Sequence, residues 1–286
     1  MSERAFGARF QIPDSTFQEA ATWNLEPGIW NLQRGGGKSD WYGHVPVLMN
    51  TFLLALLLNA AAPDVQAWLK AADATRNAFE EAVITARASQ VVDGKETGSA
   101  DFEIYTKGRD RGLIVFRGGS NSGRKVLTDG PRMWLIVPGA SRPIPVTPNQ
   151  RLLGGASMGD VARLRFAEDF TAVLRPEPES VGGKTCRVLD LTAKSPNAAY
   201  PHVVLWWNEA ERLPARVLFR LPSGKEAKQV TFTKFSRKAG KTIVSEMEIR
   251  DLLSRDPHTL TRLEYTDYRP AKLDEALFTP EGAKGL

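Results

Sequence analysis

Ser157 stands in a residue pattern that is typical of hydrolases. Residues 155–159 read Gly-Ala-Ser-Met-Gly, which matches the G-x-S-x-G motif of a nucleophile elbow. In such enzymes a histidine accepts the proton of the serine, and an acidic residue orients that histidine. His202 and His258 follow Ser157, and acidic residues lie between them. The order serine, acid, histidine is therefore available, and a serine hydrolase acting through Ser157 is a remote alternative for the function.

The segments around this motif favour a different interpretation. A nucleophile elbow joins a parallel strand to a helix in an α/β sheet. Here the motif follows a proline-rich segment, 138–148, in a chain whose other segments have the patterns of antiparallel strands. We therefore expect no catalytic residues and no enzyme activity, and we interpret residues 155–159 as a turn. His202 and His258 each follow a proline where a strand is expected to begin, so we interpret both as polar strand-end residues.

Metal and cofactor chemistry has little support in the residues. The single cysteine, Cys186, excludes an intrachain disulfide and a cysteine-rich metal site. The three histidines cannot form a metal site without carboxylate ligands. Residues 34–39, Arg-Gly-Gly-Gly-Lys-Ser, resemble a phosphate-binding loop, but Leu32 occupies the position where that loop needs its first glycine. We expect no cofactor and no metal ion.

An apolar run near the start of the chain has the layout of a secretory signal peptide. Met49 precedes the unbroken apolar segment Phe52–Leu58, and small residues follow it. A hydrophobic stretch followed by alanines is what a signal peptidase recognises, which predicts cleavage near Ala61-Ala62. Residues 49–62 are thus an expected signal peptide. The alternative is a buried helix, because a membrane span needs about 18 apolar residues.

This reading makes Met49 the expected start of the protein and residues 1–48 a mis-assigned or disordered extension. The mature protein would then be periplasmic. The formal net charge is +5, and the basic residues are scattered along the chain instead of clustered. A basic surface can suit nucleic acid, anionic lipid or simple solubility. Since an exported protein rarely meets nucleic acid, we expect no nucleic-acid partner.

The remaining chain, residues 63–286, reads as a single domain that begins with one helix and continues in strands. Asp64 is a candidate N-cap, and the apolar residues that follow it recur at helical spacing, which predicts a helix over 64–77. The expected strands are Ala82–Val92, Ala100–Thr106, Gly112–Phe116, Lys125–Thr128, Arg132–Val137, Phe170–Leu174, Thr185–Leu191, Val203–Trp207, Leu213–Leu221, Ala227–Phe235, Lys241–Asp251 and Thr259–Tyr268. Short strands with regularly spaced turns indicate an antiparallel sheet and no βαβ units.

An insertion at 138–169 interrupts the strands. Four prolines hold its first part extended, and 150–155 and 160–168 are each expected to form a short helix. A sheet of about a dozen strands twists too strongly to remain flat, so it curls towards a barrel. The predicted fold is mainly β: a large antiparallel curled sheet, or open half-barrel, with an N-terminal helix and a short helical lid insertion.

Alternating residues in the strands divide the sheet into a polar face and an apolar face. The concave apolar face would be covered by the helix and the insertion, which leaves either a cavity for an apolar ligand or a filled core. The residues on the apolar side of their strands, and therefore the candidate ligand-binding residues, are Phe102, Ile104, Val217, Phe219, Phe232, Met247 and Ile249.

Two stretches of sequence carry a resemblance to a known family. The first is residues 150–163, Gln-Arg-Leu-Leu-Gly-Gly-Ala-Ser-Met-Gly-Asp-Val-Ala-Arg, and the second is Phe278-Thr279-Pro280. Together with the expected helix and strands, they make residues 63–286 similar to the bacterial outer-membrane lipoprotein-sorting proteins, relatives of the LolA-type periplasmic lipoprotein carriers. The prolines and the long insertion are similar to a divergent branch of that family.

The resemblance implies an open half-barrel whose apolar cavity holds acyl chains without catalysing a reaction. We therefore expect a periplasmic carrier or binding protein for lipid-modified or apolar cargo, engaged in lipoprotein sorting toward the outer membrane. Its expected partners are lipoprotein acyl chains or another lipid, and an inner-membrane transporter. An accessory binding module of an inner-membrane exporter is the alternative.

Overall fold

A computed structural model describes residues 63–286 except 109, 119–120, 148–150, 154–155, 158–164, 197, 199 and 257. The expected N-terminal extension, 1–48, and the expected signal peptide, 49–62, lie outside the described residues. Within the described segments, no helix combines the length and the apolar character that a membrane crossing requires.

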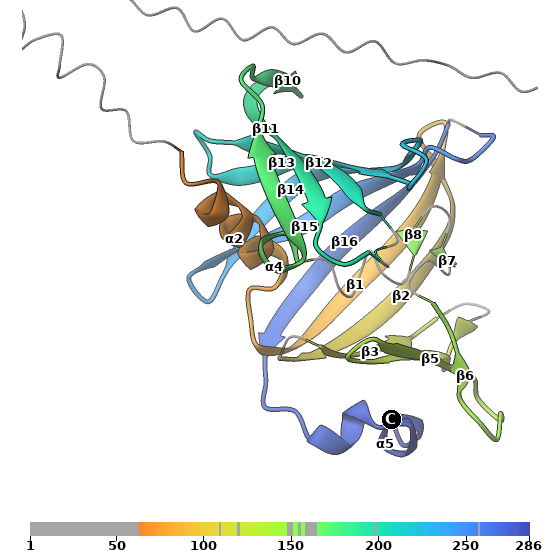
Figure 1. Cartoon of the computed structure of the whole chain (residues 1–286). Coiled ribbons are helices and arrows are strands. Elements are labelled where there is room, and N and C mark those ends of the chain that lie inside the picture. Colours follow the sequence, from red (N-terminus) through yellow and green to blue (C-terminus); the bar gives the residue numbers. More distant parts are fainter. Residues whose placement is uncertain are drawn as a thin grey trace, which may run out of the picture. The chain divides into compact units, whose positions relative to one another are not determined.

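One antiparallel sheet of 14 strands dominates the described chain (Figure 1). The strands lie in the order β10-β11-β12-β13-β14-β15-β16-β1-β2-β3-β4-β5-β6, and β9 pairs with β11 outside this path. Their bounds are β1 Glu81–Val92, β2 Lys95–Lys107, β3 Arg111–Phe116, β4 Lys125–Asp129, β5 Arg132–Ile136, β6 Ile144–Pro145, β9 Phe170–Leu174, β10 Glu179–Val181, β11 Lys184–Ala193, β12 His202–Asn208, β13 Leu213–Arg220, β14 Glu226–Lys238, β15 Lys241–Asp251 and β16 Thr259–Pro270. The sheet is curled and is not closed, which confirms the predicted fold class.

The first and the last strand of the sequence lie next to each other in this sheet. β1 pairs with β16 over nearly its whole length, with Ala88 opposite Leu263. Both free edges of the sheet are consequently formed in the middle of the chain, by β6 on one side and by β9 and β10 on the other. The insertion between β6 and β9 must therefore run from one edge of the sheet to the other.

The insertion contains a pair of short strands and one helical turn. β7 (Arg151–Leu153) pairs with β8 (Ala156–Ser157), and α4 (Phe166–Asp169) leads into β9. β7 lies against β1, and β8 lies against β15, so the insertion crosses over the sheet. The helix predicted at 150–155 is wrong, because residues 151–153 form a strand. A short apolar run such as Leu152-Leu153 suits a strand or a helix equally, and periodicity cannot separate them.

The concave face of the sheet is apolar from β5 to β11. Val217, Val230 and Ile249 are successive cross-strand neighbours on β13, β14 and β15. In the other half of the sheet, Ile84 of β1 is the cross-strand neighbour of Ile104 of β2. All of these side chains are buried and belong to one core cluster. The face is continuous because each strand presents alternate residues to the same side.

Helix α2 (Val65–Arg76) covers part of this face (Figure 1). It begins at Asp64, whose side chain accepts a hydrogen bond from the Ala67 amide at 2.9 Å, as expected for an N-cap. Leu69 is fully buried in the same core cluster as the sheet. Trp68 stacks on Trp207 of β12 with ring centroids 6.3 Å apart. The predicted N-terminal helix is thus a cover of the concave face.

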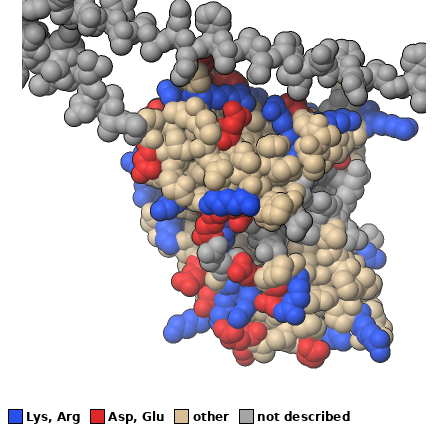
Figure 2. Space-filling view, in the orientation of Figure 1, with Lys and Arg blue, Asp and Glu red and all other residues tan. Residues whose placement is uncertain are grey.

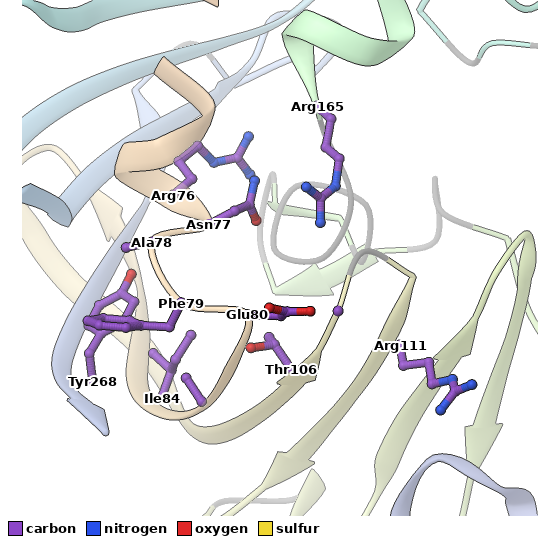
Figure 3. Close-up of a pocket in the computed structure, with 12 residues that line it drawn as sticks. Arg76, Asn77, Ala78, Phe79, Glu80, Ile84, Thr106, Arg111, Arg165 and Tyr268 are labelled. Atoms are coloured by element: carbon purple, nitrogen blue, oxygen red, sulfur yellow. The ribbon is translucent and has the colours of Figure 1, made fainter. Parts of the chain in front are cut away.

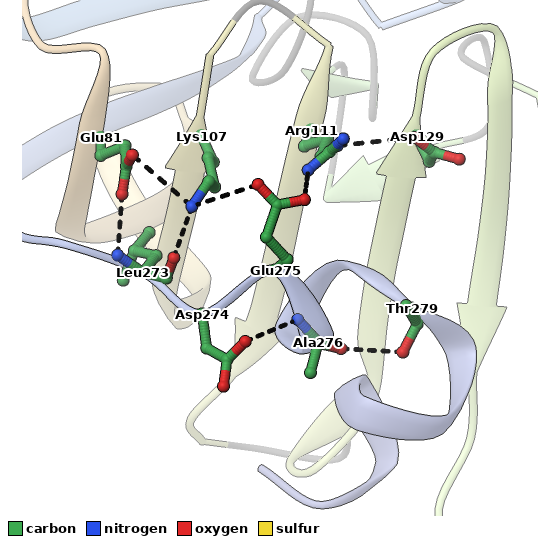
Figure 4. Close-up of polar contacts among 9 residues, drawn as sticks. All are labelled: Glu81, Lys107, Arg111, Asp129, Leu273, Asp274, Glu275, Ala276 and Thr279. Carbon is green, nitrogen blue, oxygen red and sulfur yellow. Dashed lines mark hydrogen bonds and ion pairs between the residues drawn. The ribbon is translucent and has the colours of Figure 1, made fainter.

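The C-terminal segment packs against the opposite face of β3, β4 and β5. The 3-10 helix η2 (Glu275–Phe278) and helix α5 (Pro280–Lys284) bring Phe278 into a separate cluster with Leu113, Leu127 and Ile136. Figure 4 shows the polar contacts that fix this segment: Lys107 Nζ donates to the carbonyl of Leu273 at 2.6 Å, and Arg111 pairs with Glu275. Mixed acidic and basic side chains therefore cover this end of the molecule (Figure 2).

The Phe278-Thr279-Pro280 stretch has a structural explanation. Phe278 is the buried anchor of the segment. Thr279 caps α5 by accepting from the Gly282 amide at 3.1 Å, and Pro280 occupies the first turn, where a missing N–H is harmless. Gly282 is constrained as well, because an added Cβ would overlap the backbone carbonyl of Ala276.

We predict that Gly282→Ala lowers the free energy of unfolding by about 1–3 kcal/mol, because the new methyl group cannot be accommodated without moving the backbone. Gly285→Ala is the matched control: its Cβ would meet the Gly282 carbonyl at 3.5 Å, an ordinary contact. Urea unfolding of both variants measures the difference. Equal stability of the two variants would show that the C-terminal segment does not hold the packing described.

Candidate functional site

The seven candidate ligand-binding residues all lie in the core cluster of the concave face, although they come from four strands. Their side chains are buried, with Phe232 the most accessible at 7%. Burial of this kind is compatible with a filled core and with a covered cavity. Contact between these residues and a ligand therefore stays a prediction.

A pocket with a volume of about 270 Å³ opens beside this face, and we call it the arginine pocket (Figure 3). It lies where α2 ends and where β1, β2, β3 and β16 come together. Its lining residues are Arg76, Asn77, Ala78, Phe79, Glu80, Ala82, Ile84, Thr106, Gly108, Arg111, Arg165 and Tyr268. None of the seven candidate residues is among them.

The floor of the arginine pocket is apolar and aromatic. Phe79 and Tyr268 are in contact, with ring centroids 6.4 Å apart. The Tyr268 hydroxyl donates to the carbonyl of Val244 at 3.3 Å, and burial raises the pKa of Tyr268, so the phenol remains protonated. Ile84 lies on the floor and is the cross-strand neighbour of Ile104, one of the seven candidate residues. The floor is therefore continuous with the apolar face.

The wall of the pocket formed by residues 77–80 is held in place by contacts with neighbouring strands. Lys241 of β15 donates from Nζ to the carbonyl of Ala78, and the same ammonium lies 5.0 Å from the centre of the Phe79 ring. On the other side, the Gly108 amide donates to the carbonyl of Glu80 at 2.7 Å. These contacts hold residues 77–80 in place, although the segment is neither a helix nor a strand.

Arginines from three different elements line the rim. Arg76 comes from the last turn of α2 and Arg165 from the residue before α4, and Figure 3 shows both guanidinium groups on the same side of the pocket. Arg111 lines the pocket from the start of β3, but its guanidinium turns away from the pocket, pairs with Glu275 and lies 3.9 Å from Asp129 (Figure 3). Arg76 and Arg165 also interact within the chain. The rim thus places the guanidinium groups of Arg76 and Arg165 above an apolar floor.

Asp73 connects α2 to α4 behind these arginines. Its two carboxylate oxygens accept from the amides of Phe166 and Ala167 at 2.8 and 2.9 Å. Burial raises the pKa of the Asp73 carboxyl, whereas the two amide hydrogen bonds and the nearby charges of Arg76 and Arg165 lower it. The net result is a pKa above the ordinary value. Asp73 therefore satisfies the first amides of α4 with a partly desolvated carboxylate.

A second contact holds α4 from the same helix. Gln66 Nε2 donates to the carbonyl of Ala167 at 3.0 Å. Lys194, which follows β11, donates from Nζ to the carbonyl of Glu168 at 2.8 Å. The end of the insertion is thus attached to α2 and to the sheet by these polar contacts and by the buried side chain of Phe166.

The residues of the hydrolase alternative do not form the expected context. The backbone of Ser157 belongs to β8, in a short antiparallel pair, where an elbow requires a parallel strand followed by a helix. His202 begins β12, and His258 lies 3.1 Å from Asp93 on the surface. Cys186 is buried, and the described residues contain no group of side chains suited to a metal ion.

Sequence reasoning did not identify the arginine pocket. Arg76 in the last turn of a helix is an ordinary partner of the helix dipole, and its type alone indicates no site. Arg165 lies within the insertion and far from Arg76 in the sequence. The pairing of β1 with β16 was not predicted. A prediction of this pair would have implied that the insertion returns to α2, and so that Arg165 lies near Arg76.

Comparisons with known proteins were made for the whole chain. A family model with the description "-like: Uncharacterized protein" matches residues 108–282. Among curated proteins no sequence matches this chain. A LolA superfamily protein from Nitrosomonas europaea is similar in structure, with a TM-score of 0.68 and 25% identity, over 77% of this chain and 100% of that one.

Two further solved structures share the fold at lower identity. A DUF1329 family protein from Desulfovibrio piger has a TM-score of 0.65 and 20% identity, over 77% of this chain and 99% of its own. A putative outer membrane lipoprotein-sorting protein domain from Vibrio parahaemolyticus has a TM-score of 0.62 and 18% identity, over 76% of this chain and 97% of its own.

We predict that Asp73→Asn destabilises the protein by about 1 kcal/mol, because the NH2 group of asparagine cannot accept a hydrogen bond, whereas both oxygens of the carboxyl group can. The effect depends on pH. Since the folded pKa of Asp73 lies above 3.8, its contribution to stability is complete below that pH and is lost as the pH rises through the folded pKa. The variant does not titrate at this position, so its disadvantage should shrink as the pH rises.

Urea unfolding of wild type and variant, from acid to neutral pH, measures this difference. Asp64→Asn, at the exposed start of the same helix, controls for the removal of one acidic group. A difference between wild type and Asp73→Asn that is independent of pH, or that grows with rising pH, would contradict the description of Asp73 as a desolvated carboxylate.

Proposed function

We propose a function for this chain, which belongs to the family whose model matches residues 108–282 and is a divergent LolA-like protein. It is a carrier that binds lipid-modified or otherwise apolar cargo. One observation carries this proposal: the open sheet keeps a continuous apolar face, and in the described chain that face is covered by α2, α4 and the short β7–β8 pair.

Acyl chains suit such a face for energetic reasons. Burying a methylene group contributes about 0.8 kcal/mol, so a chain of a dozen carbons gains enough to remain bound in water. The cover must move to admit it. α4 is held on α2 by the polar contacts of Asp73 and Gln66 and by the buried side chain of Phe166. Opening exchanges the polar contacts for water at little cost, and an entering acyl chain would cover the apolar surface that Phe166 leaves.

The finer proposal is periplasmic sorting of lipoproteins toward the outer membrane, with an inner-membrane transporter as the donor of the cargo. The name of the Vibrio parahaemolyticus relative and the signal-like residues 49–62 support it. The carrier would bind and release its cargo unchanged. The position of Ser157 in an antiparallel strand pair supports this absence of chemistry.

We predict that the protein expressed from Met49 reaches the periplasm with a new N-terminus between Ala61 and Asp64. The hydrophobic segment and the alanines that follow it are the features that a signal peptidase needs. Intact mass of protein recovered from the periplasmic fraction measures the cleavage. Recovery of the uncleaved chain from the cytoplasm would contradict the periplasmic proposal and leave cargo binding to be judged separately.

We predict that Phe219→Ala weakens binding of a fluorescent fatty acid while costing less than the roughly 3–5 kcal/mol expected from a filled core. If the space around Phe219 opens for an acyl chain, the substitution enlarges a space that is already accessible. Phe219→Glu should abolish binding, because the chain would meet an uncompensated carboxylate. The measurements are urea unfolding and titration of the probe, followed by mass spectrometry of the released probe, which should be chemically unchanged.

Leu218→Ala is the matched control. Leu218 is the next residue on β13, but it is buried in the cluster on the opposite face, with Val204 and Trp206. This control should lose stability and keep its affinity for the probe. The carrier proposal fails if the wild type does not bind the probe, and it also fails if Leu218→Ala and Phe219→Ala reduce binding equally.

A further inference from the structure

The arginine pocket combines two kinds of surface that an amphiphile would recognise. Its floor includes Ala82 and Ile84, which are buried side chains of β1, and the aromatic rings of Phe79 and Tyr268. Its rim is polar, and its lining contains three arginines and one acidic residue, Glu80. A purely apolar cargo would bind poorly at this rim, because the guanidinium groups would lose bound water and receive no hydrogen-bond acceptor in exchange.

Arg76 and Arg165 are the two groups best placed to bind an anion. They lie on the same side of the pocket, and they come from different elements that Asp73 holds together. Each guanidinium has five N–H donors in a planar arrangement, so interactions within the chain do not by themselves exclude a further acceptor. Both groups can therefore keep their interactions inside the protein and still donate to an oxyanion.

Arg111 contributes in a different way. Glu275 and Asp129 hold its guanidinium at the start of β3, so most of its charge is compensated by the C-terminal segment. It limits the pocket on the side away from Arg165 (Figure 3). The amides at the start of α4 are not available to an anion, since the Asp73 carboxylate accepts from them. The guanidinium groups of Arg76 and Arg165, which lie together on one side of the pocket, are therefore the candidate anion-binding groups (Figure 3).

We propose that the arginine pocket binds the anionic head group of an acyl amphiphile, with Arg76 and Arg165 donating to its oxyanion. The acyl chain runs from the head group over Ile84 to Ile104, and from there along the concave face. This inference rests on the proposed carrier function and adds the class of cargo. The head group is a carboxylate, as in a fatty acid, or a phosphate, as in a monoacyl glycerol phosphate, because both present oxyanions that guanidinium groups bind.

The test compares three probes with the same acyl chain: palmitate, palmitoyl glycerol phosphate and neutral palmitoyl glycerol. Each is titrated against the full-length protein by displacement of a fluorescent fatty acid. Wild type should bind at least one anionic probe about tenfold or more tightly than the neutral probe, since two charge-assisted hydrogen bonds are added. The probe that gains most identifies the head group as carboxylate or phosphate.

The double variant Arg76→Gln, Arg165→Gln should lose this preference, so that all three probes bind with similar affinity. Arg124→Gln is the matched control. Arg124 is an exposed arginine immediately before β4, at the end of β3 that is far from Arg111, and its replacement removes the same kind of charge. This control should keep the preference. If the double variant fails to fold, raised salt provides a second test, because it should weaken only the anionic probes bound to wild type.

The outcomes separate this inference from the carrier function. Equal binding of neutral and anionic probes by wild type overturns the inference and leaves the carrier function intact. A preference that survives in the folded double variant, or that disappears equally in Arg124→Gln, overturns it as well. Failure of all three probes to bind refutes the carrier function itself.

Discussion

The pairing of β1 with β16 determines how the rest of this structure is arranged. Because the first and last strands of the chain are neighbours inside the sheet, neither of them forms a free edge of the sheet. Its free edges belong to strands from the middle of the chain, and the segment that joins them has to cross the sheet. That crossing places β7 and β8 over the strands and brings α4 against α2. The cover and the arginine pocket are both consequences of this one strand pair.

The two faces of the sheet have different roles because they are covered by different kinds of contact. On the convex face, Phe278 is anchored in an apolar cluster, and Glu81 accepts from the amide of Leu273 at 2.8 Å, so the C-terminal segment is fixed by burial and by hydrogen bonds together. At β12, Trp206 is buried on the convex side under Arg216, whose guanidinium carbon lies 4.1 Å from the ring centre. These strands therefore form a rigid support for the concave face.

Much of the fold could be predicted from the sequence, because alternation of polar and apolar residues is a strong signal in long strands. The bounds expected for β9 and β15 agree with the structure, and the face assigned to Val217 and Phe219 is the buried concave one. Short elements escaped prediction. β10 has three residues, which is too few for a period to be recognised, and the strand at 151–153 was interpreted as a helix.

The pocket could not be predicted for a different reason. Its chemistry depends on Arg76 and Arg165 being neighbours, and no local pattern specifies a contact between residues so far apart in the sequence. The contact requires the β1–β16 pair, the crossing insertion and the Asp73 carboxylate that accepts from the start of α4. Each of these is a tertiary interaction. Sequence periodicity indicates which face of each strand is apolar. It contains no information about which edge of the sheet the chain reaches after the insertion.

The same arrangement explains how one sheet can be both stable and able to open. The long strand pairs, such as β1 with β2 and β14 with β15, keep the curvature of the concave face whether or not the cover is closed. The cover is linked to α2 by the Gln66 amide, by the buried Phe166 and by the Asp73 carboxylate, whose pKa is raised by burial. Opening it rehydrates that carboxylate, which offsets part of the cost of breaking its hydrogen bonds. Under the proposed carrier function, a cover that separates from a strongly paired sheet would let the protein take up an acyl chain and later release it.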